Sequence, residues 1–227
     1  MAAKKVMSAL PKEFWTFFRQ LAKNNNREWF HEHKAQYESF VKKPFADLTD
    51  ALIDAIRDVD PRIQITSKEA LFRIYRDVRF AKDKTPYTLH ASAIISPFGR
   101  KSEGYPGFYI HASPGKSMVG GGAWMPNKEQ LATIRSMIAD NPAALHSLLK
   151  AKPFVKHLGA LQGEKNKVMP AEFKVAAKAE PLIANKQFYF MTDVPDDVFS
   201  SPDTIARLMQ YYKAAVPLNT YLQQAFE

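Results

Sequence analysis

The 227-residue chain contains no cysteine. Disulfide bonds and thiol catalysis are therefore excluded, and a zinc site would need ligands from carboxylates and the six histidines alone. No apolar run approaches the roughly 20 residues that span a bilayer. The lysine pair near the start is not followed by the apolar stretch of a secretion signal. We therefore expect a soluble cytoplasmic protein without a membrane partner.

The sequence also lacks motifs that would identify a reaction. The chain has no Gly-x-Ser-x-Gly elbow that would expose a nucleophilic serine. The Gly120–Gly122 triplet is not followed by the Gly-Lys-Ser/Thr ending of a Walker phosphate loop. The sequence thus leaves the cofactor, the reaction (if any) and the oligomeric state open.

Net charge gives the first positive indication of a partner. The formal charge is +9 and the isoelectric point is about 9.5. Such an excess favours nucleic acid, phosphorylated metabolites or anionic surfaces, although it also serves solubility alone. Hydrophobic residues make up 46% and charged residues 24% of the chain, which is the range of folded globular proteins.

The densest charge pattern lies between Leu71 and His90. This segment contains five cations (Arg73, Arg76, Arg79, Lys82 and Lys84), two acids (Asp77 and Asp83) and four aromatic residues (Phe72, Tyr75, Phe80 and Tyr87). A strand over 71–80 would place Arg73 and Arg79 on one face. A helix behind a Thr66–Glu69 capping box would instead cluster Arg73 with Arg76. The aromatic and β-branched content favours the strand, and either geometry predicts the wall of an anion-binding cleft.

The residue types in this segment suit such a cleft. Guanidinium groups donate paired hydrogen bonds to phosphate or carboxylate oxygens, and lysines add point charges. The predicted ligand-binding residues are Arg73, Arg76, Arg79, Lys82, Lys84, Tyr87, Gly120, Gly121 and Gly122. The candidate catalytic residues are Asp77, Tyr87 and His90. Tyr87 and His90 could donate or shuttle a proton, and Asp77 could act as a general base or hold Arg73 or Arg79 in place.

The glycine triplet has two interpretations. Without Cβ atoms, Gly120–Gly122 would let backbone N–H groups approach a ligand close to the helix that Asn127 and Gln130 are expected to cap. The triplet could instead form a β-bulge or a tight backbone crossing beneath Trp124. We favour the second interpretation slightly.

Hydrophobic periodicity predicts a single α+β domain, with C-terminal helices and an N-terminal helical hairpin packed on an antiparallel β-meander. The hairpin spans 11–60: one helix covers 11–23, and a second begins near Asn26, with Asn25 and Glu28 as its capping box and Pro44 dividing it. The meander spans 63–124, with strands at 87–96, 108–112 and 116–119. The remainder, 127–227, is predicted to be mostly helical, with a strand at 187–193 and a final helix after Ser201.

The second helix also carries His31 and His33. Residues two apart on a helix point to different faces, so the two imidazoles cannot easily bind one ion. We therefore predict no metal site.

The motif Arg73-x-x-Arg76-Asp77-x-Arg79-Phe80-x-x-Asp83-Lys84-x-x-Tyr87 resembles the signature of a bacterial family, domain of unknown function 2461. The resemblance extends over nearly the whole chain, through the segments 24–30, 106–109 and 120–126. It implies that these positions form one site. It implies no activity, cofactor or catalytic residue.

Three hypotheses of function follow. The first is a cleft that binds a phosphorylated or carboxylated small molecule, with or without catalysis. The second is nucleic-acid binding, in which cations contact phosphates and the interleaved aromatic rings stack on bases. The third is a structural network in which Arg73, Arg76 and Arg79 pair with acids of the protein and no ligand exists.

Overall fold

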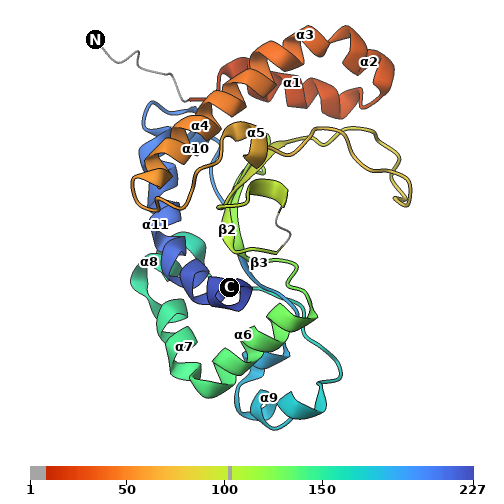
Figure 1. The fold of residues 1–227 in the computed structure, drawn as a ribbon. Helices are drawn as coiled ribbons and strands as arrows, with labels where there is room; N and C mark the ends of the chain where they lie inside the picture. The colour runs from red at the N-terminus through yellow and green to blue at the C-terminus, as the bar shows by residue number, and fades with distance from the viewer. Residues whose placement is uncertain (1–8, 102–103) are drawn as a thin grey trace. The chain divides into compact units, whose positions relative to one another are not determined.

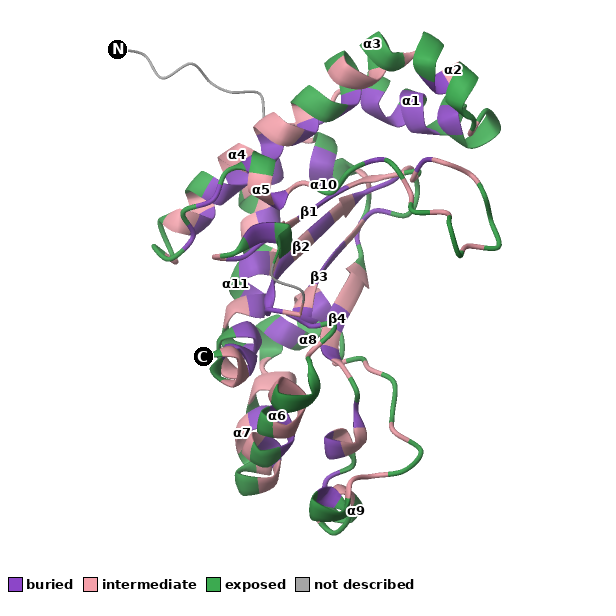
Figure 2. Cartoon of the chain, turned by 45° about the vertical axis from the view of Figure 1, so that its right-hand side comes forward, coloured by how far each residue is buried: buried purple, intermediate pink, exposed green. Residues whose placement is uncertain are grey.

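The computed structural model describes residues 9–101 and 104–227. The chain has the expected α+β class (Figure 1), with a four-stranded antiparallel sheet in the order β1-β2-β3-β4, whose strands are labelled in Figure 2. The strands are β1 (Ala91–Ile95), β2 (Gly107–Ala112), β3 (Met118–Ala123) and β4 (Phe188–Asp193). The strand expected at 187–193 and the hairpin around Ser113–Gly115 are therefore present.

The chain separates into two compact units that are interleaved along the sequence. The first holds the described residues up to Arg100, Tyr109–Val119 and Asp193–Met209. The second holds the described residues of Lys101–Phe108, Gly120–Thr192 and Gln210–Glu227. The expectation of a single domain stays a prediction.

The first unit is built on helices that the apolar spacing predicts. They are α1 (Lys12–Lys23), α2 (Arg27–Glu32), α3 (Lys34–Gln36), the π-helix η1 (Tyr37–Lys42), α4 (Lys43–Arg57), the short α5 (Ser67–Ala70) and α10 (Asp197–Ser200). Phe14, Phe18 and Phe45 are almost completely buried and pack ring against ring. Figure 2 shows that α1 presents a buried face, whereas much of α2 and α3 is exposed.

The division expected at Pro44 takes the form of a π-helix. Pro44 has no N–H, so it cannot donate to the carbonyl four residues earlier, and its ring crowds that carbonyl. The chain widens to the five-residue hydrogen-bond spacing just before it, and the Lys43 N–H donates to the Glu38 carbonyl. Isolated π-helical turns occur often at functional sites.

The predicted capping box of the second helix is wrong by one residue. Asn26, not Asn25, is the cap, and its side-chain oxygen accepts from the Trp29 N–H. Asn25 turns its amide group toward the backbone of Tyr87 instead: Nδ2 donates to the carbonyl at 2.9 Å and Oδ1 accepts from the N–H at 3.2 Å.

The expected strand over 71–80 is not continuous, and the helix behind the Thr66–Glu69 capping box ends at Ala70. Isolated antiparallel bridges instead join Leu71 to Ala93 and Tyr75 to Tyr87. The Tyr75–Tyr87 bridge consists of two backbone hydrogen bonds, from the Arg76 N–H to the Pro86 carbonyl and from the Thr88 N–H to the Ile74 carbonyl, and the segment forms an irregular ribbon. The expected strand at 87–96 is shorter than predicted, because the chain bends at Leu89 and His90 and β1 begins only at Ala91.

The second unit packs further helices around its part of the sheet. They are α6 (Lys128–Asp140), α7 (Pro142–Lys150), α8 (Lys152–Leu158), α9 (Ala176–Ala179) and the later part of α11 (Thr204–Gln223). The remaining short 3-10 helices of the chain are η2 (Gly99–Lys101), η3 (Ala171–Phe173), η4 (Pro181–Ala184) and η5 (Gln224–Phe226). The predicted Asn127–Gln130 capping box is present at α6. Among the described residues, no helix is both long and apolar enough to cross a membrane.

The glycine triplet lies inside β3 and has a packing reason. A Cβ on Gly121 would come within 2.5 Å of the Phe190 ring and 2.6 Å of the Gly107 carbonyl oxygen. Gly122 has φ of +89°, and its N–H donates to the Asn219 side chain at 2.9 Å. These contacts match the tight backbone crossing that the sequence favours over a ligand loop.

Replacing Gly121 with alanine should therefore destabilise the protein by about 3 kcal/mol, because backbone on one side cannot move away from the added methyl group. Gly115→Ala is the control, since no atom lies within 4 Å of its added Cβ and only its φ of +69° opposes the change, at a cost of about 1 kcal/mol. Urea unfolding measures both. Equal costs would contradict the packing explanation.

Candidate functional site

At the tip of the irregular ribbon, both arginines are paired with acids of the same loop. The Arg79 guanidinium donates to both carboxylate oxygens of Asp77, at 3.0 and 2.7 Å. Arg76 donates to Asp83 at 2.6 Å and also bonds to the carbonyl and hydroxyl oxygens of Thr85. Lys84 donates to the backbone carbonyls of Val78 and Arg79. Two of the three expected guanidinium ligands are thus already bound to acids of the same loop.

These hydrogen bonds also set the acidity of the two carboxyl groups. Bonds from the Thr85 N–H, the Arg76 guanidinium and the Thr85 hydroxyl lower the pKa of Asp83 to about 2. Bonds from Arg79 lower the pKa of Asp77 below its ordinary value. A low pKa makes Asp77 a weak general base, and its geometry is that of a carboxylate holding Arg79.

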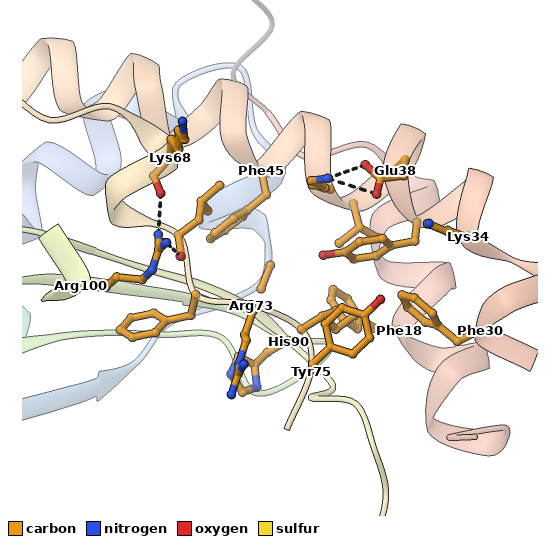
Figure 3. A pocket seen from close by; sticks show the side chains of 17 residues that line it. Phe18, Phe30, Lys34, Glu38, Phe45, Lys68, Arg73, Tyr75, His90 and Arg100 are labelled. Atoms are coloured by element: carbon orange, nitrogen blue, oxygen red, sulfur yellow. Dashed lines mark hydrogen bonds and ion pairs between the residues drawn. The ribbon is translucent and has the colours of Figure 1, made fainter. Parts of the chain in front are cut away.

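Arg73 has a different environment from the other two arginines. Within residues 9–101 and 104–227 its guanidinium makes no hydrogen bond or ion pair. It lines a cavity of about 650 Å³ in the first unit, together with Tyr75 and His90 (Figure 3). This volume lies in the range of sites for small organic ligands.

The cavity combines an apolar floor with cationic walls. The floor consists of side chains that are almost fully buried: Phe18, Phe30, Val41, Phe45 and Ile74. The lining includes five cations (Lys34, Lys42, Lys68, Arg73 and Arg100) and one carboxylate, that of Glu38. Lys42 pairs with Glu38 at 2.8 Å. Lys34, Lys68 and Arg73 have no ion-pair partner in the described part of the chain.

Two of the lining cations, Lys68 and Arg100, are positioned by hydrogen bonds to neighbouring residues. The Asp50 carboxylate accepts from the Ser67 N–H at 2.6 Å and from its hydroxyl at 2.8 Å, which fixes the start of α5 and hence Lys68. Arg100 donates to the carbonyls of Lys68 and Leu71 at 2.5 and 2.8 Å, as Figure 3 shows. Those bonds hold Arg100 but leave its charge uncompensated by an acid.

The π-helix η1 forms one wall of the cavity. Tyr37, Glu38, Val41 and Lys42 all belong to it and all line the cavity. Burial, with Glu38 and Tyr75 nearby, raises the pKa of Tyr37 to about 12. The phenol therefore stays protonated at neutral pH and can donate a hydrogen bond to an anion.

Tyr87 lies in an aromatic cluster rather than at an open site. Its ring is 5% exposed and stacks on Phe30 with centroids 4.1 Å apart. Tyr75 completes the cluster, at 5.4 Å from Tyr87 and 6.0 Å from Phe30. Burial raises the pKa of Tyr87. A second cavity, of about 610 Å³, is lined by Tyr87, Phe30 and Tyr75.

His90 lies at the cavity beside a second histidine that sequence reasoning did not select. The rings of His90 and His111 stack with centroids 3.9 Å apart, and the Tyr109 hydroxyl lies 3.1 Å from His111 Nδ1. Burial lowers the pKa of His90. Burial and the neighbouring His90 lower the pKa of His111 to about 4. Both imidazoles are therefore neutral at pH 7, and His90 is a proton acceptor at the cavity wall.

The remaining predicted residues fall outside this cavity. Lys82 is exposed on the ribbon tip. Gly120–Gly122 belong to the second unit. His33 stacks on Trp29 and bonds to its carbonyl. Among the described residues, no group of three potential metal ligands is close enough to hold an ion.

Sequence reasoning missed Lys34, Tyr37, Lys68 and Arg100 as lining residues. A signal existed for the first two, because Phe30, Lys34, Tyr37 and Val41 recur at spacings of three and four and so share one helix face. Lys68 and Arg100 gave no such signal, since only the tertiary fold brings them to the same cavity.

Comparison with known proteins shows that nearly the whole chain matches one family. Residues 13–221 match the model of the family described as conserved hypothetical protein (DUF2461), so the chain belongs to this family. Neither the search of curated proteins nor the search of solved structures found a match.

Asn25 should be important for stability because its amide satisfies two backbone groups of Tyr87. We expect Asn25→Ala to lower the free energy of unfolding by about 1–3 kcal/mol. Asn24→Ala is the matched control, since the Asn24 side chain makes an exposed hydrogen bond within its own helix. Denaturant unfolding of both variants tests this, and a loss in Asn24→Ala as large as in Asn25→Ala would contradict it.

The lowered pKa of His111 predicts a pH-dependent stability. The unfolded chain binds a proton near pH 6.5, whereas the folded chain binds it only near pH 4. Stability from this group is therefore complete above pH 6.5 and is lost as the pH falls toward 4. Because His111 is partly exposed, we expect a loss of about 1 kcal/mol. His111→Gln should reduce the slope of unfolding free energy against pH in this window, and an unchanged slope would contradict the assignment.

Proposed function

We propose that the protein binds a small anionic molecule with an apolar body in the cavity of the first unit. The anionic group, a phosphate or carboxylate, contacts Arg73, and Lys34 and Lys68 add positive charge to the lining. The apolar body lies on the floor of phenylalanine and aliphatic side chains. This proposal keeps the predicted ligand class but moves the site from the ribbon tip to the cavity.

One observation carries the proposal: Lys34, Lys68 and Arg73 line the cavity above a buried apolar floor and make no ion pair among the described residues, and the acids whose pKa values Lys68 and Arg73 lower, Glu69 and Asp77, lie outside the lining. Like charges gathered without counter-charges repel one another, and a bound anion relieves that repulsion. A guanidinium donates two parallel hydrogen bonds to a phosphate or carboxylate. The Tyr37 phenol adds a neutral donor from the opposite wall.

The arrangement also supports catalysis by proton transfer, although it does not require it. His90 is a neutral imidazole in the same cavity as Arg73. A bound molecule with an acidic proton near the imidazole would meet a general base, and Arg73 would stabilise negative charge that develops on oxygen.

A second candidate function, binding of single-stranded nucleic acid, is favoured by Phe80. This ring is 95% exposed at the ribbon tip. The Arg79 guanidinium lies 5.9 Å from the ring centroid, and Lys82 lies two residues further along the chain. Bases stack on exposed aromatic rings while cations contact the phosphates.

The ion pairs of Arg76 and Arg79 favour the structural hypothesis for those two residues.

Isothermal titration with hexyl phosphate, phenyl phosphate and inorganic phosphate tests the small-molecule proposal. The two organic phosphates should bind more tightly than inorganic phosphate, because the floor removes their apolar groups from water. Arg73→Ala should weaken binding of the organic phosphates by about 10- to 100-fold, since it removes a charge-assisted hydrogen bond.

Arg79→Ala is the matched control, because Arg79 is also exposed on the ribbon but lines neither cavity. It should leave the affinity for the organic phosphates unchanged, and both variants should keep the wild-type melting temperature within a few degrees. Equal affinities of wild type and Arg73→Ala would overturn the proposal, as would the absence of binding by all three phosphates.

A further inference from the structure

The two cavities of the first unit share part of their lining. Phe30, Lys34 and Tyr75 belong both to the 650 Å³ cavity and to the 610 Å³ cavity. Tyr75 is 52% exposed although it belongs to the aromatic cluster. In Figure 3 it lies between Arg73 on one side and Phe30 on the other. The shared residues show that the two cavities adjoin, with Tyr75 and Lys34 in the lining of both, and we call the adjoining pair the groove and each cavity one half of it.

The second half, the 610 Å³ cavity, also combines apolar side chains with cations. Its apolar lining comes from Phe30, Val78, Pro86 and Tyr87. Its cations are Arg27, Lys34 and Arg76, and its carboxylate is that of Glu28. Arg76 is already bound to Asp83 and Thr85, whereas Arg27 makes no ion pair or hydrogen bond with its side chain among the described residues. Arg27 is therefore the cation available at this end.

We propose that the groove binds an elongated molecule with two anionic groups joined by an apolar or aromatic linker. One phosphate or carboxylate contacts Arg73 in the first half, and the other contacts Arg27 in the second half. The linker passes over the exposed ring of Tyr75, and Lys34 lies close to its midpoint. This inference rests on the proposed function and adds to it the second anionic group.

The charge distribution is the reason for two groups rather than one. A molecule with a single anionic group would compensate the cations of the first half and leave Arg27 unpaired. Tethering a second anion to the first makes its binding to Arg27 intramolecular, so a gain in affinity follows without further contacts. The gain depends on linker length, because a linker that is too short cannot reach the second cation.

A series of α,ω-alkane bisphosphates of increasing length, each compared with the alkyl monophosphate of the same length, tests the inference by isothermal titration. The wild-type protein should bind the bisphosphate of optimal length at least about tenfold more tightly than its monophosphate. Arg27→Ala should abolish this gain and leave monophosphate binding unchanged. Arg73→Ala should weaken both ligands.

Arg19→Ala is the matched control, because Arg19 is an exposed arginine of the same helical region that lines neither half. It should change neither affinity. Thermal unfolding without ligand checks that Arg27→Ala stays folded, and Arg27→Lys should recover part of the gain. If monophosphates bind through Arg73 but bisphosphates bind no more tightly, the two-anion inference fails and the proposed function stands.

If neither series binds, both fail. A single-stranded oligonucleotide that binds more tightly than every bisphosphate, and that loses affinity in Phe80→Ala, would also overturn the inference. In that case the ribbon tip, rather than the groove, would be the main binding surface.

Discussion

The cavity of the first unit depends on the attachment of an irregular ribbon to a helical scaffold. An ordinary strand is held by neighbours along its whole length, but the ribbon of residues 71–90 has isolated bridges and a few backbone hydrogen bonds. Asn25 supplies what a neighbouring strand would: an amide is both donor and acceptor, so it pairs with both backbone groups of Tyr87. The stack of Phe30 on Tyr87 then fixes the angle between ribbon and helices.

This attachment explains why one aromatic cluster lies where the two cavities adjoin. Tyr87 is buried against Phe30, and its bridge partner Tyr75 is thereby held beside the same ring. Tyr75 contacts both rings from the exposed edge of this cluster. It remains half exposed at the junction, where its ring can contact a ligand. The burial of Tyr87 therefore determines the position of Tyr75.

Much of the architecture could be predicted from the sequence. The apolar spacing in α1 and α4, the Asn127–Gln130 cap and the strand β4 all follow from local patterns that tertiary contacts reinforce. The ribbon could not be predicted in the same way. Its alternation of aromatic and charged residues matches a strand, but Asp77 and Asp83 bind arginines of the same loop and bend the chain away from regular pairing.

The site was also predicted only in part, because it depends on which side chains the fold brings together. Sequence spacing shows which cations are near one another along the chain, but it does not show which acids will reach them. Arg76 and Arg79 have acids within seven residues and bind them. Arg73 has Asp77 four residues away and helps to lower its pKa, but Asp77 forms its ion pair with Arg79, and Arg73 lines the cavity. Lys68 and Arg100 come together through the backbone carbonyls that Arg100 binds, a contact that no local pattern encodes.

The distribution of paired and unpaired cations is itself an argument for a ligand. Exposed ion pairs contribute little to stability, so pairing Arg76 with Asp83 mainly gives the ribbon tip a defined shape. Arg73, Lys34 and Lys68 have the opposite character, because these exposed cations gather around an apolar floor and make no ion pair within the part of the chain that the structure describes. A protein that needed only solubility could spread these charges over its surface at less cost. An anion with an apolar body satisfies both the cations and the floor, and this joint requirement connects the fold of the first unit to its proposed function.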